Sequence, residues 1–258
     1  MRYIKIKLIH TLLILVLLFN VRPAQADEVK AAVAANFSAP MKQIIDVFEK
    51  ETGNTVKVSF GSSGKLYSQI QEGASFDIFL SADESVPIKL VKENLAEVHS
   101  IFIYALGKLV LWSPKQNYAG PHESVVSKLE NGQFKKLAIA NPKLAPYGMA
   151  AYEVLENMSL LNTLQNKIVM GESITQTYQF AATENVDFAF IALSQITKNG
   201  HISGGSFWLV PANLYKPIKQ SAVLLSCAQN NNAAKAFLIF LKSQKSKDII
   251  QSFGYEAP

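Results

Sequence analysis

Four short segments of the sequence combine small, hydroxyl and amide residues in a way that suits the binding of an anion. Each follows an apolar run of strand length and directly precedes a helix-like pattern. The four segments are residues 34–38, 61–64, 141–148 and 171–174. Helix N-termini present unpaired N–H groups and the positive end of the helix dipole, so segments of this kind favour a negatively charged ligand. The chemistry that they predict is capture of an anion by neutral hydrogen-bond donors.

The sharpest of the four segments is 61–64, with the sequence Gly-Ser-Ser-Gly. Its glycines allow the backbone to approach a ligand closely, and the hydroxyls of Ser62 and Ser63 are additional donors. A glycine-flanked helix cap explains the same residues without a ligand. The segment is not a phosphate-binding P-loop, because Leu66 stands where that motif has Ser or Thr, and it does not contain the G-x-S-x-G of serine hydrolases.

The other three segments offer donors of different kinds. Asn36 carries a side-chain amide as well as its backbone N–H, with a plain helix cap as the alternative. Two prolines stiffen the third segment, so Tyr147 and the following amides either face outward from the sheet or belong to a rigid connector. Ser173 and Gln176 fit a capping box, which leaves Ile174 a backbone N–H and an apolar side chain to contribute.

The residue types needed for catalysis or metal binding are poorly placed in the sequence. The histidines after residue 26 lie beside no candidate nucleophile and at no metal-ligand spacing from one another. These histidines are His99, His122 and His201. We interpret them as surface or turn residues, and we expect no catalytic residue, no direct metal ligand and no cofactor. An envelope hydrolase that uses Ser62 or Ser63 is an alternative, but it needs a base, and only Lys65 is near.

The first 26 residues predict a secretory signal peptide. Basic residues precede the apolar run 8–19 and an Ala-Gln-Ala cleavage site follows it, so the mature chain is expected to begin at Asp27. A membrane anchor is the alternative, but the run is shorter than the roughly 20 residues that span a bilayer. The whole chain has 25 lysines and arginines and 20 acidic residues. Four of the basic residues and none of the acidic ones lie in this segment, so its removal lowers the formal charge from +5 to +1. No arginine remains and the lysines are scattered, so nucleic-acid binding is not expected.

The single cysteine, Cys227, cannot form an intramolecular disulfide. It lies in the apolar run 222–228, and we interpret it as a small buried residue. No lipid-attachment cysteine follows the signal peptide, which predicts an untethered protein in the periplasm.

Strand-length apolar runs alternate with helical patterns along the mature chain, which predicts the α/β class. The first round has strands at 29–35, 56–60 and 78–81 and helices at 39–51, 65–72 and 86–94. A strand-rich stretch at 101–112 and a loop at 114–121 precede the second round. That round has strands at 137–140, 168–170, 188–191 and 207–210 and helices at 149–158, 175–183 and 193–198. The chain closes with a strand at 222–227 and a helix at 233–242.

This order predicts two lobes, one of which interrupts the other. Lobe one is expected to comprise residues 27–107 and 213–258, and lobe two residues 108–212. Each lobe would hold a mixed, mostly parallel sheet flanked by helices. Two strands that cross between the lobes would form a hinge over a cleft. The first two anion-binding segments would then lie on one wall of the cleft and the last two on the other.

At these segments the chain resembles the periplasmic molybdate-binding proteins of ATP-driven importers, in particular the branch with Ala-Asn-Phe at the first segment. The matching stretches are 35–37, 61–64, 79–84, 107–112, 141–148, 188–195 and 208–211. They occur in the same order over essentially the whole mature chain. The resemblance implies a two-lobed type II binding-protein fold that encloses an oxyanion, molybdate or tungstate, and delivers it to the membrane permease of an ABC importer.

The resemblance also implies particular site residues, with donors in lobe one and backbone amides in lobe two. The donors are Asn36 and Ser63, and the amides are those of Tyr147 and Ile174. Ala35 departs from relatives that carry a hydroxyl residue, so only its backbone N–H would contribute, and Ser62 is a further candidate. The protein is expected to act as a monomer.

Sulfate and phosphate are the nearest alternatives to molybdate. Protonated phosphate needs an acceptor in the site, and within the four segments only Glu172 could serve. Sulfate presents the same deprotonated shell of oxygens as molybdate, so the size of the cavity must discriminate between them. A receptor for amino acids or dicarboxylates would use a bidentate arginine, which the mature chain lacks.

Overall fold

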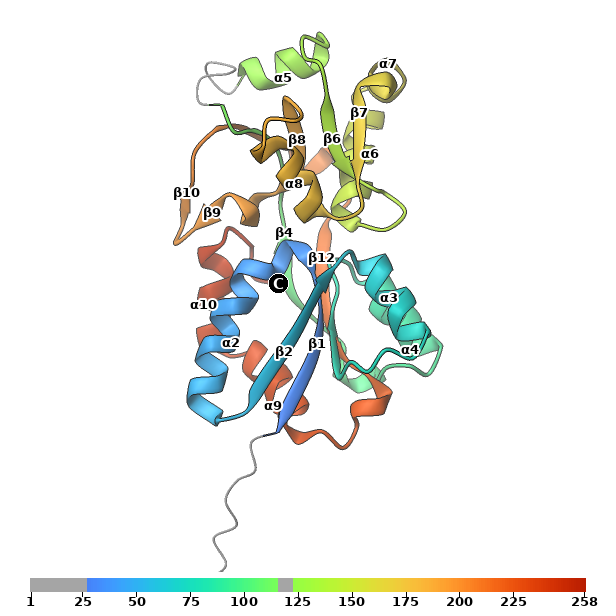
Figure 1. The fold of residues 1–258 in the computed structure, drawn as a ribbon, viewed down its shortest axis with the longest axis vertical. Coiled ribbons are helices and arrows are strands. Elements are labelled where there is room, and N and C mark those ends of the chain that lie inside the picture. The colour runs from blue at the N-terminus through green and yellow to red at the C-terminus, as the bar shows by residue number, and fades with distance from the viewer. Residues whose placement is uncertain (1–26, 116–122) are drawn as a thin grey trace, which may run out of the picture.

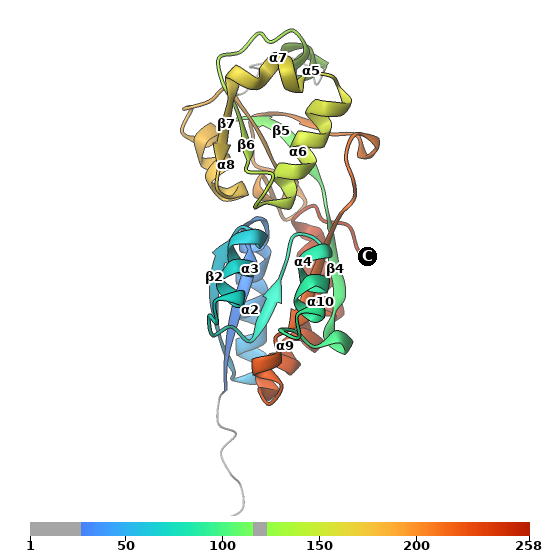
Figure 2. The same cartoon turned by 90° about the vertical axis from the view of Figure 1, so that its right-hand side faces the viewer.

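The computed structural model describes residues 27–115 and 123–258. The predicted signal peptide and His122 lie outside the described residues. Figures 1 and 2 show two lobes stacked along the long axis, each built on one sheet with helices packed against it. The predicted α/β class and the two-lobed architecture are confirmed. None of the helices in the described ranges is long and apolar enough to cross a membrane.

Lobe one contains a five-stranded sheet in the order β2-β1-β3-β12-β4. Its strands are β1 (Glu28–Ala34), β2 (Thr55–Gly61), β3 (Ile78–Leu80), β4 (Phe102–Gly107) and β12 (Ile218–Leu224). Strand β1 pairs in parallel with β2 and β3, whereas β12 is antiparallel to β3 and β4. The helices of this lobe are α2 (Ser38–Thr52), α3 (Ser63–Gln71), α4 (Ser85–Lys92), α9 (Asn232–Leu241) and α10 (Gln244–Ser252).

Lobe two contains a second five-stranded sheet in the order β11-β5-β8-β6-β7. Its strands are β5 (Leu109–Ser113), β6 (Leu137–Ala140), β7 (Ile168–Gly171), β8 (Phe188–Ala192) and β11 (Ser206–Leu209). Strand β6 is parallel to β7 and β8, and β5 is antiparallel to β8 and β11. The helices are α5 (Glu123–Glu130), α6 (Pro146–Asn157), α7 (Leu161–Leu164) and α8 (Ile174–Ala182), and β9 (Thr197–Lys198) and β10 (His201–Ile202) form a small hairpin.

The first helix shows how the sequence pattern becomes structure. Met41, Ile44, Ile45 and Phe48 recur at helical spacing and are all buried, so α2 presents one apolar stripe to the sheet. The helix ends at Gly53, whose φ of 73° is left-handed and whose N–H donates to the carbonyl oxygen of Glu49. The helix predicted at 39–51 is therefore confirmed within one residue at each end.

Alternate side chains of the interior strand β1 enter two different cores. Val29, Ala31 and Val33 pack on one face with α2 and α9, and Ala32 packs on the other face with α3. A sheet covered on both faces explains why β1 is apolar from Ala31 to its end.

The chain crosses between the lobes twice. Lys108 is the single residue between β4 of the first sheet and β5 of the second, and the return path runs from β11 to β12. Figure 2 shows both crossings on one side of the molecule, beside the C-terminal tail. The boundaries at 107/108 and 212/213 stay a prediction.

Three features differ from the expectations. Cys227 is exposed rather than buried, because β12 ends at Leu224 and the cysteine lies in the 3-10 helix η6 (Ser226–Ala228). The helix predicted at 193–198 is a 3-10 helix, η4 (Leu193–Gln195), followed by β9, a span too short for an α-helix. Helices α5, α7 and α10 were not predicted.

Candidate functional site

A small cavity lies between the lobes, at the ends of the strands that precede the four predicted segments. It leaves only about 10 Å³ to the centre of a water-sized sphere, roughly the room of a single water molecule. That space excludes an extended organic substrate. All six candidate residues line it, namely Ala35, Asn36, Ser62, Ser63, Tyr147 and Ile174. The fold therefore brings together residues that are far apart in the sequence.

Three helices and one 3-10 helix begin at the wall of this cavity. The 3-10 helix η1 (Ala35–Phe37) follows β1 and α3 follows β2, while α6 and α8 begin just beyond β6 and β7. The strands of each pair are neighbours in one sheet, so each lobe supplies two helix starts to its wall. The first N–H groups of a helix have no acceptor within it. The positive ends of several helix dipoles thus converge on one cavity, an arrangement that stabilises an anion.

The two serines of the 61–64 segment both line the cavity, but their hydroxyl groups differ in hydrogen bonding. Ser63 Oγ accepts a hydrogen bond from the backbone N–H of Ala82 at 3.0 Å, which leaves the hydroxyl proton free to be donated. Ser62 Oγ is buried and has no hydrogen-bond partner within the described part of the chain. A buried hydroxyl without a partner is unfavourable, so a ligand oxygen in the cavity would complete the bonding of Ser62.

Asn36 uses its side chain inside the protein. Its Nδ2 donates to Gln220 Oε1 at 2.8 Å and to Tyr255 Oη at 2.9 Å. Both amide hydrogens are therefore engaged, which the sequence did not indicate. The backbone N–H of Asn36, in the first turn of η1, is the donor that this residue can direct toward the cavity.

Behind Tyr147 lies a buried polar group that sequence reasoning missed. Gln220 donates from Nε2 to Tyr147 Oη at 3.2 Å and accepts at Oε1 from Tyr104 Oη at 2.9 Å. Gly107 makes room for this pair, because a Cβ there would lie 2.1 Å from Tyr147 Oη. The sequence gives no clear signal, because Gln220 stands between Lys219 and Ser221, yet its side chain is fully buried. A buried amide of this kind requires partners, which here come from both lobes.

At the start of α8, one half of the predicted capping box is present. Ser173 Oγ accepts from the backbone N–H of Gln176 at 3.3 Å, as expected for an N-cap. Gln176 Oε1 returns to the N–H of Glu172 rather than to that of Ser173, at 2.7 Å. The cap leaves Ile174 as the first residue of α8, on the cavity wall.

The residues that line the cavity are small, apolar or neutral polar ones. No charged side chain is among the described residues that line it. Burial is the main cause that raises the pKa of Tyr255 to about 12, and it raises the pKa values of Tyr104 and Tyr147 well above 10. These hydroxyls stay protonated at physiological pH and remain able to donate hydrogen bonds.

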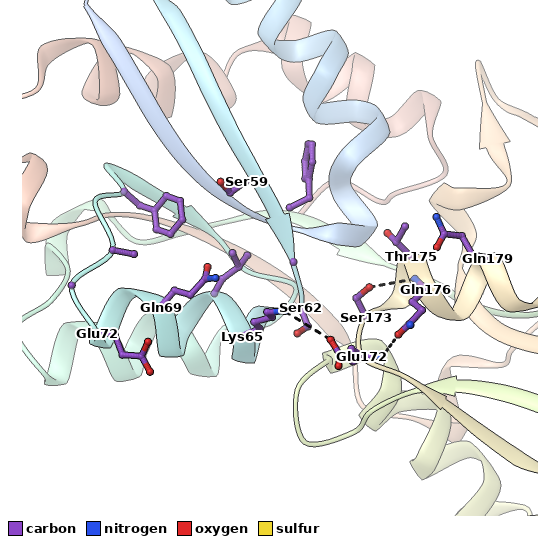
Figure 3. A pocket seen from close by; sticks show the side chains of 16 residues that line it. Ser59, Ser62, Lys65, Gln69, Glu72, Glu172, Ser173, Thr175, Gln176 and Gln179 are labelled. Atoms are coloured by element: carbon purple, nitrogen blue, oxygen red, sulfur yellow. Dashed lines mark hydrogen bonds and ion pairs between the residues drawn. The ribbon is translucent and has the colours of Figure 1, made fainter.

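Direct bonds hold the lobes together around the cavity. The N–H of Gly64 in lobe one donates to the carbonyl oxygen of Leu144 in lobe two at 2.9 Å. On the outer side lies a groove of about 750 Å³ between α3 and α8 (Figure 3). Lys65 and Glu172 approach each other across it, with 3.8 Å between Nζ and Oε2. Both side chains are more than half exposed, so this ion pair contributes at most about 1 kcal/mol.

Residues with catalytic or metal-binding chemistry do not gather at the cavity. His99 and His201 are exposed, as predicted. Within residues 27–115 and 123–258, no group of three or more His, Cys, Asp or Glu side chains is placed to hold a metal ion. The arrangement can hold a small anion through neutral donors from two lobes.

A two-lobed α/β fold with a small cavity between the lobes is typical of solute-binding proteins. Residues 29–256 match the family of bacterial extracellular solute-binding proteins, and the chain belongs to that family.

Within this family the chain is similar to molybdate-binding proteins. It is 50% identical to the molybdate-binding protein ModA of Azotobacter vinelandii over 232 residues, which cover 90% of this chain and 91% of that protein. It is 48% identical to ModA of Rhodobacter capsulatus over 233 residues, or 90% of each chain. The solved periplasmic molybdate-binding protein of A. vinelandii superposes with a TM-score of 0.85 at 39% identity, covering 89% of this chain and 99% of that one. The resemblance inferred from the four segments is confirmed.

Proposed function

We propose that this protein captures molybdate or tungstate in the cavity between its lobes and delivers it to an ABC importer. The observation that carries the proposal is the convergence of helix N-termini and the unpartnered Ser62 hydroxyl on one small, uncharged cavity. The similarity to molybdate-binding proteins over about nine-tenths of the chain supports this choice of anion.

The proposed ligand contacts divide between the two lobes. In lobe one they are the backbone N–H of Asn36 and the hydroxyl of Ser63, with Ser62 and the N–H of Ala35 as further donors. In lobe two they are the backbone N–H groups of Tyr147 and Ile174. The Ser62 Oγ, which has no hydrogen-bond partner in the described chain, supports a role for that serine as a donor.

Neutral donors suit a protein that must release its cargo. Hydrogen bonds to a charged group contribute about 1.5 to 3 kcal/mol each, so half a dozen suffice without a countercharge. These bonds come from two lobes, so opening the hinge breaks the set.

We propose that lobe one comprises residues 27–107 and 213–258 and that lobe two comprises residues 108–212. We propose that the mature protein acts in the periplasm as a monomer and passes the anion to the importer's membrane permease.

Other assignments have less support. Protonated phosphate would need an acceptor, but Glu172 belongs to the outer groove and not to the cavity lining. A hydrolase would need a base in contact with Ser62 or Ser63. Ser63 Oγ accepts a hydrogen bond from the backbone N–H of Ala82 rather than contacting a base, and Lys65 forms an ion pair with Glu172. Sulfate differs from molybdate mainly in size and is therefore the alternative ligand that is hardest to distinguish from it.

A titration with four anions tests the proposed function. Molybdate and tungstate are expected to raise the melting temperature of the purified mature protein far more than sulfate or phosphate. An anion that binds only the folded state stabilises that state against unfolding. At 100 times the dissociation constant the gain is about 2.7 kcal/mol. Equal shifts with all four anions would contradict the selectivity, and no shift with any would contradict the function.

A substitution at Ser62 gives a second test, because it is expected to change the affinity for the anion without lowering the stability of the protein. Replacing Ser62 with alanine removes a hydroxyl that makes no hydrogen bond in the described chain. The free energy of unfolding of the anion-free protein should not fall, whereas affinity for molybdate should drop about tenfold. Chemical denaturation and calorimetric titration measure the two quantities. Unchanged affinity would remove Ser62 from the site.

A further inference from the structure

A ring of hydrogen bonds joins the two lobes beside the cavity. Ser194, in η4 of lobe two, has its Oγ 3.0 Å from the carbonyl oxygen of Asn36 and 2.9 Å from Tyr255 Oη. Asn36 Nδ2 completes the ring by donating to Tyr255 Oη at 2.9 Å. All three residues are buried, so water cannot replace these bonds while the lobes are closed.

Each group in the ring can donate one hydrogen in a consistent direction. In one such direction the amide of Asn36 donates to Tyr255, the hydroxyl of Tyr255 donates to Ser194, and the hydroxyl of Ser194 donates to the carbonyl oxygen of Asn36. The Tyr255 hydroxyl also lies 2.9 Å from that carbonyl oxygen, so it can donate there while Ser194 donates to Tyr255 Oη; either arrangement keeps a hydrogen bond from Ser194 to lobe one. Two members belong to lobe one and one belongs to lobe two. The ring is therefore complete only when the lobes are closed. It holds the side chain and the carbonyl group of Asn36, which follows Ala35 at the cavity wall.

Tyr255 reaches this position through the C-terminal tail. The backbone of Glu256 exchanges two hydrogen bonds with Leu106 of β4, at 3.0 and 3.1 Å. Its carboxylate also lies 2.7 Å from Nζ of Lys108, the residue between β4 and β5. The tail that carries Tyr255 is thus attached to the crossing between the lobes.

We propose that Tyr255 and Ser194 form a latch that stabilises the closed state and positions the Asn36 backbone against the anion. The inference rests on the proposed function, and it assigns positioning roles to two residues outside the cavity lining. An interaction made only in the closed state shifts the equilibrium between open and closed toward closed. Release of an enclosed anion requires opening, so the latch lowers the dissociation rate and leaves the association rate largely unchanged.

Tyr104 offers a matched control for Tyr255. Each tyrosine exposes only 4% of its surface, and each packs edge-on against Phe37, with ring centroids at 4.8 Å for Tyr104 and 5.6 Å for Tyr255. The hydroxyl of Tyr104 bonds to the Ser81 carbonyl oxygen and to Gln220, both in lobe one. Loss of either hydroxyl removes a buried hydrogen bond, but only Tyr255 loses one to the other lobe.

Kinetics of molybdate release test the latch. The variants Tyr255→Phe and Ser194→Ala are expected to release molybdate about tenfold faster than the unmodified protein, with association rates unchanged within about twofold. Tyr104→Phe should lower the melting temperature of the anion-free protein by a similar amount to Tyr255→Phe while its release rate stays within about twofold of the unmodified protein. Equal acceleration in the two tyrosine variants, or none in Tyr255→Phe, would overturn the proposal.

A measurement without any anion separates this inference from the proposed function. Spin labels at Glu72→Cys and Gln179→Cys, in a Cys227→Ser background, report the distance across the outer groove, since both labelled positions are exposed and line it. Tyr255→Phe should shift the population toward longer distances, and Tyr104→Phe should not. If the unmodified protein failed to bind molybdate, this shift would still support the latch. Identical distance distributions in the two variants would overturn it.

Discussion

Replacing Gly148 with alanine is expected to abolish most of the anion binding and to destabilise the protein by about 3 kcal/mol. A Cβ at this position would lie 2.2 Å from the carbonyl oxygen of Ala140 and 2.7 Å from its carbonyl carbon. Both atoms belong to the backbone of β6, which cannot give way like the end of a flexible side chain. Helix α6 must therefore shift at its first turn, where Tyr147 lines the cavity and where we propose that its N–H binds the anion. Loss of that donor and its neighbours should weaken molybdate binding about 100-fold.

The control for this substitution is Gly53→Ala. Gly53 has a φ of 73° and no atom within 4 Å of an added Cβ, so its replacement introduces backbone strain without a clash. We expect a loss of about 1 kcal/mol in the free energy of unfolding and no change in affinity. Urea denaturation and calorimetric titration of both variants measure these effects. If Gly148→Ala bound molybdate as tightly as the unmodified protein, the start of α6 would not belong to the site.

Replacing Ser63 with alanine is expected to weaken molybdate binding between about 10-fold and 100-fold. The substitution removes a hydroxyl whose oxygen already accepts from Ala82 N–H and whose proton is available to the anion. A hydrogen bond to a charged group contributes about 1.5 to 3 kcal/mol, which sets this range. The Ala82 N–H also loses its acceptor, so a smaller loss of stability, about 1 kcal/mol, should accompany the loss of affinity.

Ser68, on the same helix α3, supplies the matched control. It is exposed, and its Oγ bonds to the carbonyl oxygen of Gly64 at 3.2 Å. Ser68→Ala should leave affinity within about twofold of the unmodified protein, because the bond lies within the helix and away from the cavity. Equal affinity in Ser63→Ala and Ser68→Ala, measured by calorimetry, would exclude Ser63 as a ligand.

Local signals account for much of what could be predicted. The strand and helix starts around residues 34–38 and 61–64 follow from apolar runs that end in small residues, and they hold within a residue or two. Such boundaries depend on neighbours in the chain, so the sequence displays them directly. Helices α5 and α10 escaped notice because their apolar residues are few and their stability comes from packing against the rest of a lobe.

Cys227 illustrates the limit of composition. An apolar neighbourhood indicated burial, yet the chain turns away after Leu224 and leaves the thiol at the surface. Hydrophobicity averaged over a run cannot show where a strand ends: Leu225 is still buried, but Cys227, three residues past the end of β12, is exposed.

The sequence by itself determined the class of this protein and indicated a site of neutral donors: it is an alternating α/β chain whose helix starts carry donors and which has no arginine after residue 26. Only the tertiary structure decided how those donors are held. Asn36 bonds to Gln220 and Tyr255, which lie 184 and 219 residues away, and Ser194 of the other lobe closes the ring. Helix starts are encoded by adjacent residues, whereas partners for buried polar groups are chosen by packing across the whole fold.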